Sequence, residues 1–250
     1  MGTSSTSFFF LLLLLLCAGS VAAQPATGAD PGRVDLFVAG QGPGIVYPCF
    51  RQPALLAAGS TLLAFAEGRN VSSCAPPQRP GANEVGGLVL RRSTDGGRSW
   101  TPPVTIHSGN IDFYSLVHDP ATGVVHLMLQ EAGVLYFRST DAGASWATPT
   151  PLHARVPPGL SIIPAVGHGI VVNASLCAGG PCRQAGRLVL PFVCTNTSAS
   201  GANPDAGQCP KCHSCLLVSD DHGASWSVAG VGQSGSRECQ VFFFTHKELM

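Results

Sequence analysis

The chain has 250 residues, of which 11% are charged, and its 14 basic and 14 acidic side chains give a formal net charge of zero. Without a basic excess it lacks the charge that binds nucleic-acid phosphates, and 45% hydrophobic residues exclude an intrinsically disordered chain. Its 30 glycines and 20 prolines disfavour a mainly helical protein, because proline breaks helix interiors and glycine weakens them. The composition indicates a turn-rich, all-β globular protein.

The N-terminal segment has the pattern of a secretory signal peptide. An apolar run over residues 8–16 is followed by small residues up to Ala23, as signal peptidase requires. The run is too short for a membrane span of about 20 residues, and no later segment predicts a stable span. N-myristoylation at Gly2 is an alternative, but that modification needs no such apolar run. We expect residues 1–23 to be a signal peptide and residues 24–44 a short lead-in.

Entry into the secretory pathway would explain the glycosylation sequons and the cysteines of the chain. Sequons for N-glycosylation occur at Asn70, Asn173 and Asn196. Nine cysteines remain after Cys17 is removed, so an oxidising compartment favours disulfides and leaves at least one thiol free or paired between chains. One cluster has the two-residue spacing that is typical of zinc ligands. It is formed by Cys209, Cys212, His213 and Cys215. No second half-site lies at a typical distance, so we expect disulfides and no metal there.

An eight-residue pattern, Ser-x-Asp-x-Gly-x-Ser-Trp, occurs three times. The copies, called boxes below, span residues 93–100, 139–146 and 219–226. All three tryptophans of the chain end a box, which argues against coincidence. Aspartate accepts hydrogen bonds from a turn's own backbone, glycine allows positive φ, and tryptophan offers a large apolar face. Each box therefore predicts a structural β-hairpin turn, with key residues Asp95, Trp100, Asp141, Trp146, Asp221 and Trp226.

The spacing of the boxes predicts the architecture. Strand patterns lie at 61–67, 87–92, 123–130, 133–138, 186–193 and 214–218. The first two boxes are 46 residues apart, which is the length of one four-stranded propeller blade of about 40–50 residues. The next interval, of 80 residues, holds a blade plus an insertion rich in Cys, Gly and Asn. A β-propeller is the fold that this repeat predicts.

These motifs together resemble the sialidase (neuraminidase) family, in particular lysosomal-type exo-α-sialidases. The boxes correspond to the family's Asp boxes, Phe50-Arg51-Gln52-Pro53 to its Arg-Ile-Pro motif in a Gln form, and Arg237-Glu238-Cys239-Gln240 to its Glu-Cys-Gln segment. The likeness covers roughly residues 45–242. It implies a six-bladed β-propeller that is incomplete here, with about three and a half to four blades in residues 45–250. The chain thus resembles a C-terminally truncated sialidase.

The resemblance implies retaining hydrolysis of terminal α-linked sialic acids from glycoproteins, oligosaccharides and gangliosides, without cofactor or metal, in the lysosome or outside the cell. Sialic acid bears a carboxylate, and an arginine guanidinium binds a carboxylate through a planar fork of donors. Arg51 matches the first of three family arginines, Arg69 a second-strand arginine near the substrate, and Glu67 the acid that orients them. The alternatives are a surface ion pair for Arg51 and a strand-end ion pair for Glu67 with Arg69.

The remaining catalytic roles are only partly matched. The family's nucleophile is a tyrosine with a glutamate base, which avoids repulsion between a carboxylate nucleophile and the substrate. Glu238 matches that base, while the loop over 70–86 lacks the family's acidic Asp and offers Glu84 instead. Glu131 is a candidate for the pocket around the N-acyl or glycerol group. The other two arginines and the tyrosine have no match here.

We therefore expect little or no sialidase activity from the 250-residue chain alone. Two further functions stay open. One is a catalytically inactive sialidase-like fragment that binds sialic acid, and the other is a scaffold for protein partners. The sequence predicts no oligomeric state.

Overall fold

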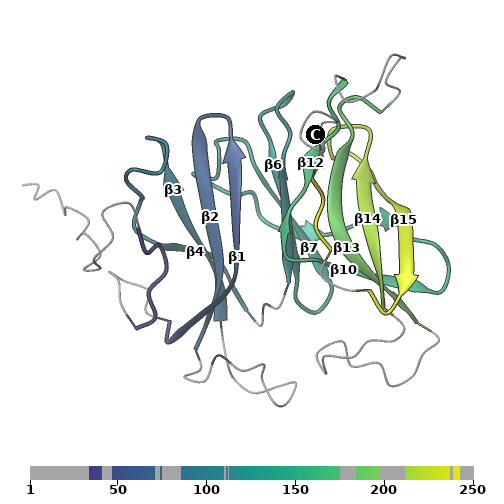
Figure 1. Ribbon diagram of the computed structural model, residues 1–250, viewed down its shortest axis with the longest axis horizontal. Coiled ribbons are helices and arrows are strands. Elements are labelled where there is room, and N and C mark those ends of the chain that lie inside the picture. The colour runs from purple at the N-terminus through teal and green to yellow at the C-terminus, as the bar shows by residue number, and fades with distance from the viewer. Residues whose placement is uncertain are drawn as a thin grey trace, which may run out of the picture.

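The computed structural model describes residues 34–40, 47–70, 74, 86–109, 111, 113–174, 184–197, 212–236 and 239–242. The predicted signal peptide lies outside these residues. The described residues form fifteen strands in three sheets, which stand side by side around a common centre (Figure 1). Among them, no helix has the length and apolar character to cross a membrane.

The long strands of the three sheets, called A, B and C below, follow one another along the chain, while the short β11 of sheet B comes after β9 and β10 of sheet C. Sheet A contains β1 (Cys49–Ala58), β2 (Thr61–Arg69), β3 (Gly86–Ser93) and β4 (Val104–Gly109), in that order. In sheet B the order is β11 (Gly167–His168), β5 (Tyr114–His118), β6 (Val125–Gln130), β7 (Val134–Ser139) and β8 (Thr150–Pro151). In sheet C it is β10 (Leu160–Pro164), β13 (Leu188–Asn196), β14 (Cys212–Ser219), β15 (Trp226–Ser234) and β9 (Ala154–Arg155), while β12 (Ile170–Val171) also pairs with β13.

This order is that of propeller blades. In each sheet the long strands follow one another outward in chain order by antiparallel pairing, and short strands pair in parallel at the edges of two sheets, β11 beside β5 and β9 beside β15. The protein is thus an all-β, incomplete β-propeller with three blades among its described residues, against an expected three and a half to four. Residues 239–242 leave sheet C and cross to the inner edge, where Gln240 donates a hydrogen bond to the Val166 carbonyl at 2.5 Å (Figure 1).

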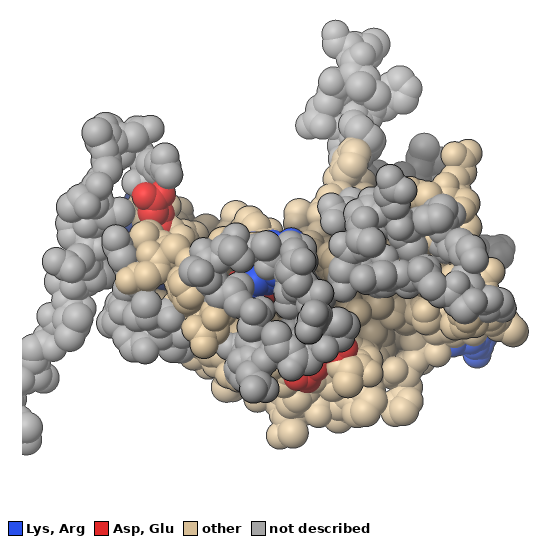
Figure 2. All heavy atoms as spheres, turned by 90° about the horizontal axis from the view of Figure 1, so that it is seen from below, with Lys and Arg blue, Asp and Glu red and all other residues tan. Residues whose placement is uncertain are grey.

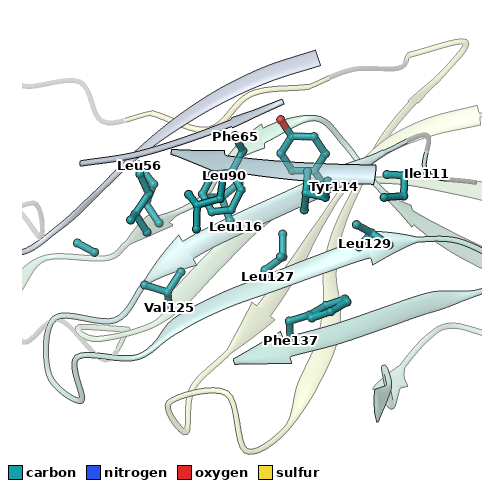
Figure 3. Close-up of a cluster of buried hydrophobic side chains, with 13 residues drawn as sticks. Leu56, Phe65, Leu90, Ile111, Tyr114, Leu116, Val125, Leu127, Leu129 and Phe137 are labelled. Carbon is teal, nitrogen blue, oxygen red and sulfur yellow. The ribbon is translucent and has the colours of Figure 1, made fainter. Parts of the chain in front are cut away.

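Two hydrophobic clusters join the sheets. The cluster between sheets A and B is mainly aliphatic and is shown in Figure 3. Its largest fully buried side chains include Phe65, Leu88, Leu116 and Leu127. The cluster between sheets B and C includes Met128, Leu190, Phe192 and Trp226. Strand β2 is buried on both faces, which explains why its sequence is nearly continuously apolar instead of alternating.

The cysteines of the described residues are mostly paired. Disulfides join Cys49 to Cys74 and Cys194 to Cys215, and Cys212 is also disulfide-bonded. Cys239 is the free thiol among the described cysteines. Two members of the cluster with zinc-like spacing, Cys212 and Cys215, are therefore not thiolates, while Cys209 lies outside the described residues.

Candidate functional site

A row of side chains crosses sheet A at the end where β1 begins. Arg51 on β1 is paired with Glu67 on β2, Glu67 with Leu88 on β3, and Leu88 with His107 on β4. Directly opposed residues of a sheet point to the same face, and Leu88 belongs to the core shared with sheet B. The row therefore faces sheet B. Viewed from this end of the molecule, a small group of basic and acidic atoms lies near the middle of a mostly uncharged surface (Figure 2).

Glu67 and Arg69 form a buried ion pair at the end of β2. Glu67 is 1% exposed and Arg69 is 6% exposed, and Nε of Arg69 donates to Oε1 of Glu67. Buried charges are tolerated when they are paired and hydrogen-bonded, so each side chain holds the other in place. This ion pair agrees with the alternative interpretation, a strand-end ion pair between Glu67 and Arg69. It is also compatible with a role for Glu67 in orienting Arg69.

Glycine at position 68 is required between these two charges. A Cβ atom there would lie 2.4 Å from Cδ2 of Tyr47, whose ring packs on the face of β2 opposite Glu67 and Arg69. The Tyr47 hydroxyl is 3.3 Å from Oγ1 of Thr105. The Tyr47 ring therefore supports the end of β2 on one face, and the side chains of Glu67 and Arg69 lie on the other face, toward sheet B.

Arg51 differs from Arg69 in having no described partner. It is half-buried, and no described residue accepts a hydrogen bond or forms an ion pair with its guanidinium. It also borders a pocket of about 450 Å³, in whose described lining it is the one charged residue. The rest of that lining is apolar and includes Phe37, Phe50 and Leu55. A half-buried cation with free donors is suited to bind an anionic group of a ligand.

The backbone beside Arg51 is irregular. Gln52 has φ of 51°, in the left-handed region, and the pairing of β1 with β2 shifts register between Arg51 and Ala54. The Gln52 carbonyl accepts a hydrogen bond from the hydroxyl of Tyr114, the first residue of β5. Burial, and then the nearby Glu67 carboxylate, raise the pKa of Tyr114 far above its ordinary value. Tyr114 therefore stays a neutral hydrogen-bond donor.

Glu131 lies at the outer end of the row. Its Oε2 is 3.0 Å from Nε2 of His107, and the His107 ring packs edge-on against Phe137 with centroids 5.4 Å apart. The apolar side chain of Leu88 stands between Glu67 and His107 in the row. The structure thus joins Arg51, Glu67 and Arg69 at the inner strands and leaves Glu131 two strands away.

Two predicted catalytic residues, Glu84 and Glu238, lie outside the described residues. Residues 239–242 are described, and the first two of them, Cys239 and Gln240, contact inner strands. Cys239 packs beside Val193 and Ile163, and the Gln240 side chain contacts Gly167, which pairs with Ser115 on β5. Ser115 directly follows Tyr114, so the chain returns to the inner strands immediately after Glu238.

The three boxes are hairpin turns at the opposite end of their sheets from Arg51. They connect β3 to β4, β7 to β8 and β14 to β15. In the second box, the Asp141 carboxylate accepts from Ser139 Oγ at 2.8 Å, Ser145 N at 2.9 Å and Ser145 Oγ at 2.6 Å. These hydrogen bonds lower the pKa of Asp141 to about 2, and the same contacts recur at Asp95 and Asp221.

In the second and third boxes the final tryptophan packs on the preceding sheet. Trp146 of sheet B lies edge-on to Phe65 of sheet A, with centroids 6.2 Å apart. Trp226 of sheet C lies edge-on to His126 and Tyr136 of sheet B, at 5.7 and 6.1 Å. Trp100, in the first sheet, instead donates a hydrogen bond from Nε1 to the Gly97 carbonyl of its own turn at 3.0 Å. The second and third boxes are therefore structural joints between blades.

The asparagines of the three sequons, Asn70, Asn173 and Asn196, are exposed. Three further residues of the site region, Tyr114, Gln52 and His107, were not predicted. Tyr114 and Gln52 are 62 residues apart, and no local pattern links them. A glutamine next to a proline in a motif whose usual residue is isoleucine is the one local signal that marked Gln52.

No family model and no curated protein sequence matches the chain. Its fold is similar to that of solved sialidases. The Hadza microbial sialidase Hz136 has a TM-score of 0.59 and 20% identity, over 77% of this chain and 39% of that one. A mutant of Trypanosoma rangeli sialidase that displays trans-sialidase activity has a TM-score of 0.57 and 17% identity, over 82% of this chain and 36% of that one.

The intramolecular trans-sialidase from Ruminococcus gnavus, in complex with oseltamivir carboxylate, has a TM-score of 0.50 and 13% identity, over 73% of this chain and 60% of that one. This chain spans less than two thirds of the length of each of the three. At such identities the likeness concerns the fold. The described residues have the fold of the sialidase β-propeller, incomplete in number of blades.

Proposed function

We propose that this chain carries part of the substrate site of an exo-α-sialidase, which hydrolyses terminal α-linked sialic acids of glycoproteins, oligosaccharides and gangliosides with retention. The observation that carries the proposal is Arg51. It is a half-buried guanidinium without a described partner, placed at the inner end of the first blade and beside the buried pair of Glu67 and Arg69. The forked donors of Arg51 suit the carboxylate of sialic acid.

In this mechanism Arg51 binds the substrate carboxylate, and Glu67 holds Arg69 in position near it. Glu238 acts as base for a tyrosine nucleophile, whose oxygen bonds to the anomeric carbon as the glycosidic bond breaks. Glu84 gives its proton to the leaving oxygen and then activates the water that releases sialic acid. Glu131 takes part more remotely, at the rim near the N-acyl or glycerol group.

None of the three tyrosines of this chain has the setting of that nucleophile. Tyr47 packs behind Gly68, Tyr114 is fully buried, and Tyr136 lies between sheets B and C. We therefore propose that the 250-residue chain alone binds sialic acid but turns over little or no substrate. Loss of one preorganised charge contact can cost a factor of about 10²–10³ in rate. Residues 1–23 and the sequons support action in the secretory pathway, with the lysosome or extracellular space as destination.

The test measures binding and turnover separately. Binding of DANA, an inhibitor that a solved Trypanosoma rangeli sialidase structure holds, is measured by calorimetry with the chain and its Arg51→Ala variant. Hydrolysis of a fluorogenic sialoside is measured at acid and neutral pH. We expect DANA binding that Arg51→Ala abolishes, and little turnover. Arg155→Ala, at an exposed arginine on β9, is the matched control and should bind normally.

Absence of DANA binding by the unaltered chain would rule out the proposed site. Turnover that is robust and lost in Arg51→Ala would instead show that the chain, or a second copy of it, supplies the missing nucleophile. Binding without turnover corresponds to the sialic-acid-binding fragment.

A further inference from the structure

We propose that Tyr114 is a positioning residue for Arg51, which it holds in place through the backbone of Gln52. The inference rests on the proposed function for the role of Arg51 itself. It concerns a contact between two blades, because Tyr114 belongs to sheet B and Arg51 to sheet A.

The contact is a hydrogen bond from a fully buried phenol. Tyr114 is 0% exposed, and its hydroxyl donates to the Gln52 carbonyl. Figure 3 shows the ring at one end of the aliphatic cluster, with the hydroxyl oxygen turned away from Leu116 and Leu129. The ring itself packs against Phe65 of β2, with centroids 6.3 Å apart. Packing thus fixes the ring, and the ring fixes the position of the hydroxyl.

Gln52 needs such support, because its conformation is unfavourable in isolation. A residue with a side chain pays roughly 1 kcal/mol to enter the left-handed region that φ of 51° represents. Its side-chain Oε1 is also buried and has no hydrogen-bond partner in the described part of the chain. Neither the positive φ nor the unpaired Oε1 of Gln52 stabilises the irregular stretch of β1. The hydrogen bond from Tyr114 provides the stabilisation that the local sequence does not.

The irregular stretch determines where Arg51 points. Extra residues in one strand of an antiparallel pair bend that strand and redirect the neighbouring side chains. Here the shift lies directly after Arg51, between Arg51 and Ala54, while Arg51 itself remains paired with Glu67. If residue 52 relaxed to an extended conformation, the direction of Arg51 relative to Glu67 would change. The Tyr114 hydroxyl opposes this relaxation.

Tyr114 next to Glu67 resembles a tyrosine nucleophile with its glutamate base, but the geometry excludes that role. A nucleophile must be reached by the substrate, and Tyr114 has no exposed surface. Its hydroxyl proton is already donated to a carbonyl, which an attacking phenolate could not do. Its contribution is therefore to the geometry of Arg51.

The experiment compares Tyr114→Phe with Tyr136→Phe in the full chain. Tyr136 is the matched control, because its hydroxyl also reaches another sheet, at the Gly223 carbonyl 3.4 Å away, and contacts His126 of its own sheet at 2.6 Å, but far from Arg51. DANA affinity is measured by calorimetry, and amide hydrogen exchange is followed over residues 49–58. Loss of one hydrogen bond corresponds to about a fivefold change in an equilibrium constant.

We expect Tyr114→Phe to weaken DANA binding about fivefold and to speed amide exchange in residues 49–58 by a similar factor. Tyr136→Phe should leave both unchanged, even where it lowers the unfolding temperature. Gln52→Gly supplies a second background, because glycine adopts positive φ without strain. In that background the additional change Tyr114→Phe should weaken DANA binding less than about twofold. Glycine at position 52 has less tendency to relax to an extended conformation, so the Tyr114 hydroxyl has less to prevent.

Two results would overturn the proposal while leaving the proposed function intact. One is unaltered DANA affinity in Tyr114→Phe when Arg51→Ala abolishes binding. The other is an equal loss in the presence and absence of Gln52→Gly, which would indicate a general packing role. If the unaltered chain fails to bind DANA, the proposed function fails and the positioning role fails with it.

Discussion

The two interfaces between blades use the same turn but different side chains. Where the box of sheet B meets sheet A, a Cβ atom on Gly143 would be 3.2 Å from Leu63 and 3.4 Å from Leu90. Where the box of sheet C meets sheet B, a Cβ atom on Gly223 would be 2.4 Å from the His126 ring. The first joint is apolar, with leucines beside the rings of Phe65 and Trp146, and the second is a cluster of polar aromatic rings.

The polar joint is also more extensively hydrogen-bonded. His126 stacks on Tyr136 with an interplanar angle of 6° and contacts its hydroxyl, while its other nitrogen, Nε2, is buried without a described partner. Nearby, His222 of the box reaches Oδ2 of the buried Asp119 at 2.8 Å. The box therefore fixes the geometry of a joint, and the preceding sheet fixes its chemistry. The second joint should therefore respond to pH, and the first should not.

The largest expected effect comes from the cores of the two joints. Phe65→Ala at the first interface should lower the free energy of unfolding by about 3–5 kcal/mol, since it removes a fully buried ring. Phe192→Ala, equally buried at the second interface, should cost a similar amount at pH 7. Urea denaturation followed by tryptophan fluorescence measures both. A Phe192 variant with less than half the loss would mean that the second joint contributes little to stability.

The second prediction concerns pH. Burial lowers the pKa of His126 to about 4, from about 6.5 in an unfolded chain. Between these values the unfolded chain binds a proton that the folded chain does not, so stability falls as the pH drops. From pH 7 to pH 4.5 the loss should be about 2 kcal/mol. Carboxylates with lowered pKa values, such as Asp141, lose their contribution only below about pH 4.

Removal of the His126 ring should remove most of this pH dependence, and His118, whose pKa burial also lowers, should account for the remainder. His126→Gln is expected to flatten the unfolding free energy between pH 7 and 4.5, whereas His153→Gln, at an exposed histidine, should leave the slope unchanged. Urea denaturation across the pH series gives the slope. An identical slope in His126→Gln would contradict the assignment of the pH response to this joint.

The smallest expected effect is a difference in the free energy of unfolding between variants of the three boxes. Asp141→Ala and Asp221→Ala should each lower the free energy of unfolding by about 1 kcal/mol, because each carboxylate orders a turn whose tryptophan packs on another sheet. Asp95→Ala should cost less, since Trp100 bonds back to its own turn. Equal losses in all three variants, measured at pH 7, would show that the boxes stabilise only their own hairpins.

The blade architecture was predictable because its signals are local. Each box carries its aspartate, glycine and tryptophan within eight residues, and the strands before the boxes are runs of apolar residues. All six predicted strand patterns coincide with strands of the structure. The other nine strands of the described residues have no predicted pattern; of the long ones, β1 contains Gln52-Pro53 and β15 is rich in glycine. Both exist through pairing with a stronger neighbour, which is a tertiary effect.

The site was predictable where a motif carried it. Arg51, Glu67 and Arg69 lie on neighbouring strands of one hairpin, so their proximity follows from the spacing of that hairpin. Contacts between sheets were not predictable in this way. The bond between Tyr114 and Gln52 and the pairing of Glu131 with His107 depend on how sheet B packs on sheet A, which no short motif encodes.

The order in which the boxes contact the sheets has a consequence for folding during synthesis. Trp146 packs on a sheet completed earlier in the chain, and so does Trp226. Neither joint waits for residues that come later. A nascent chain can therefore complete sheet A, dock sheet B on it, and then dock sheet C, in the order in which the ribosome delivers them. Each joint then shields the apolar face of the preceding sheet from aggregation while synthesis continues.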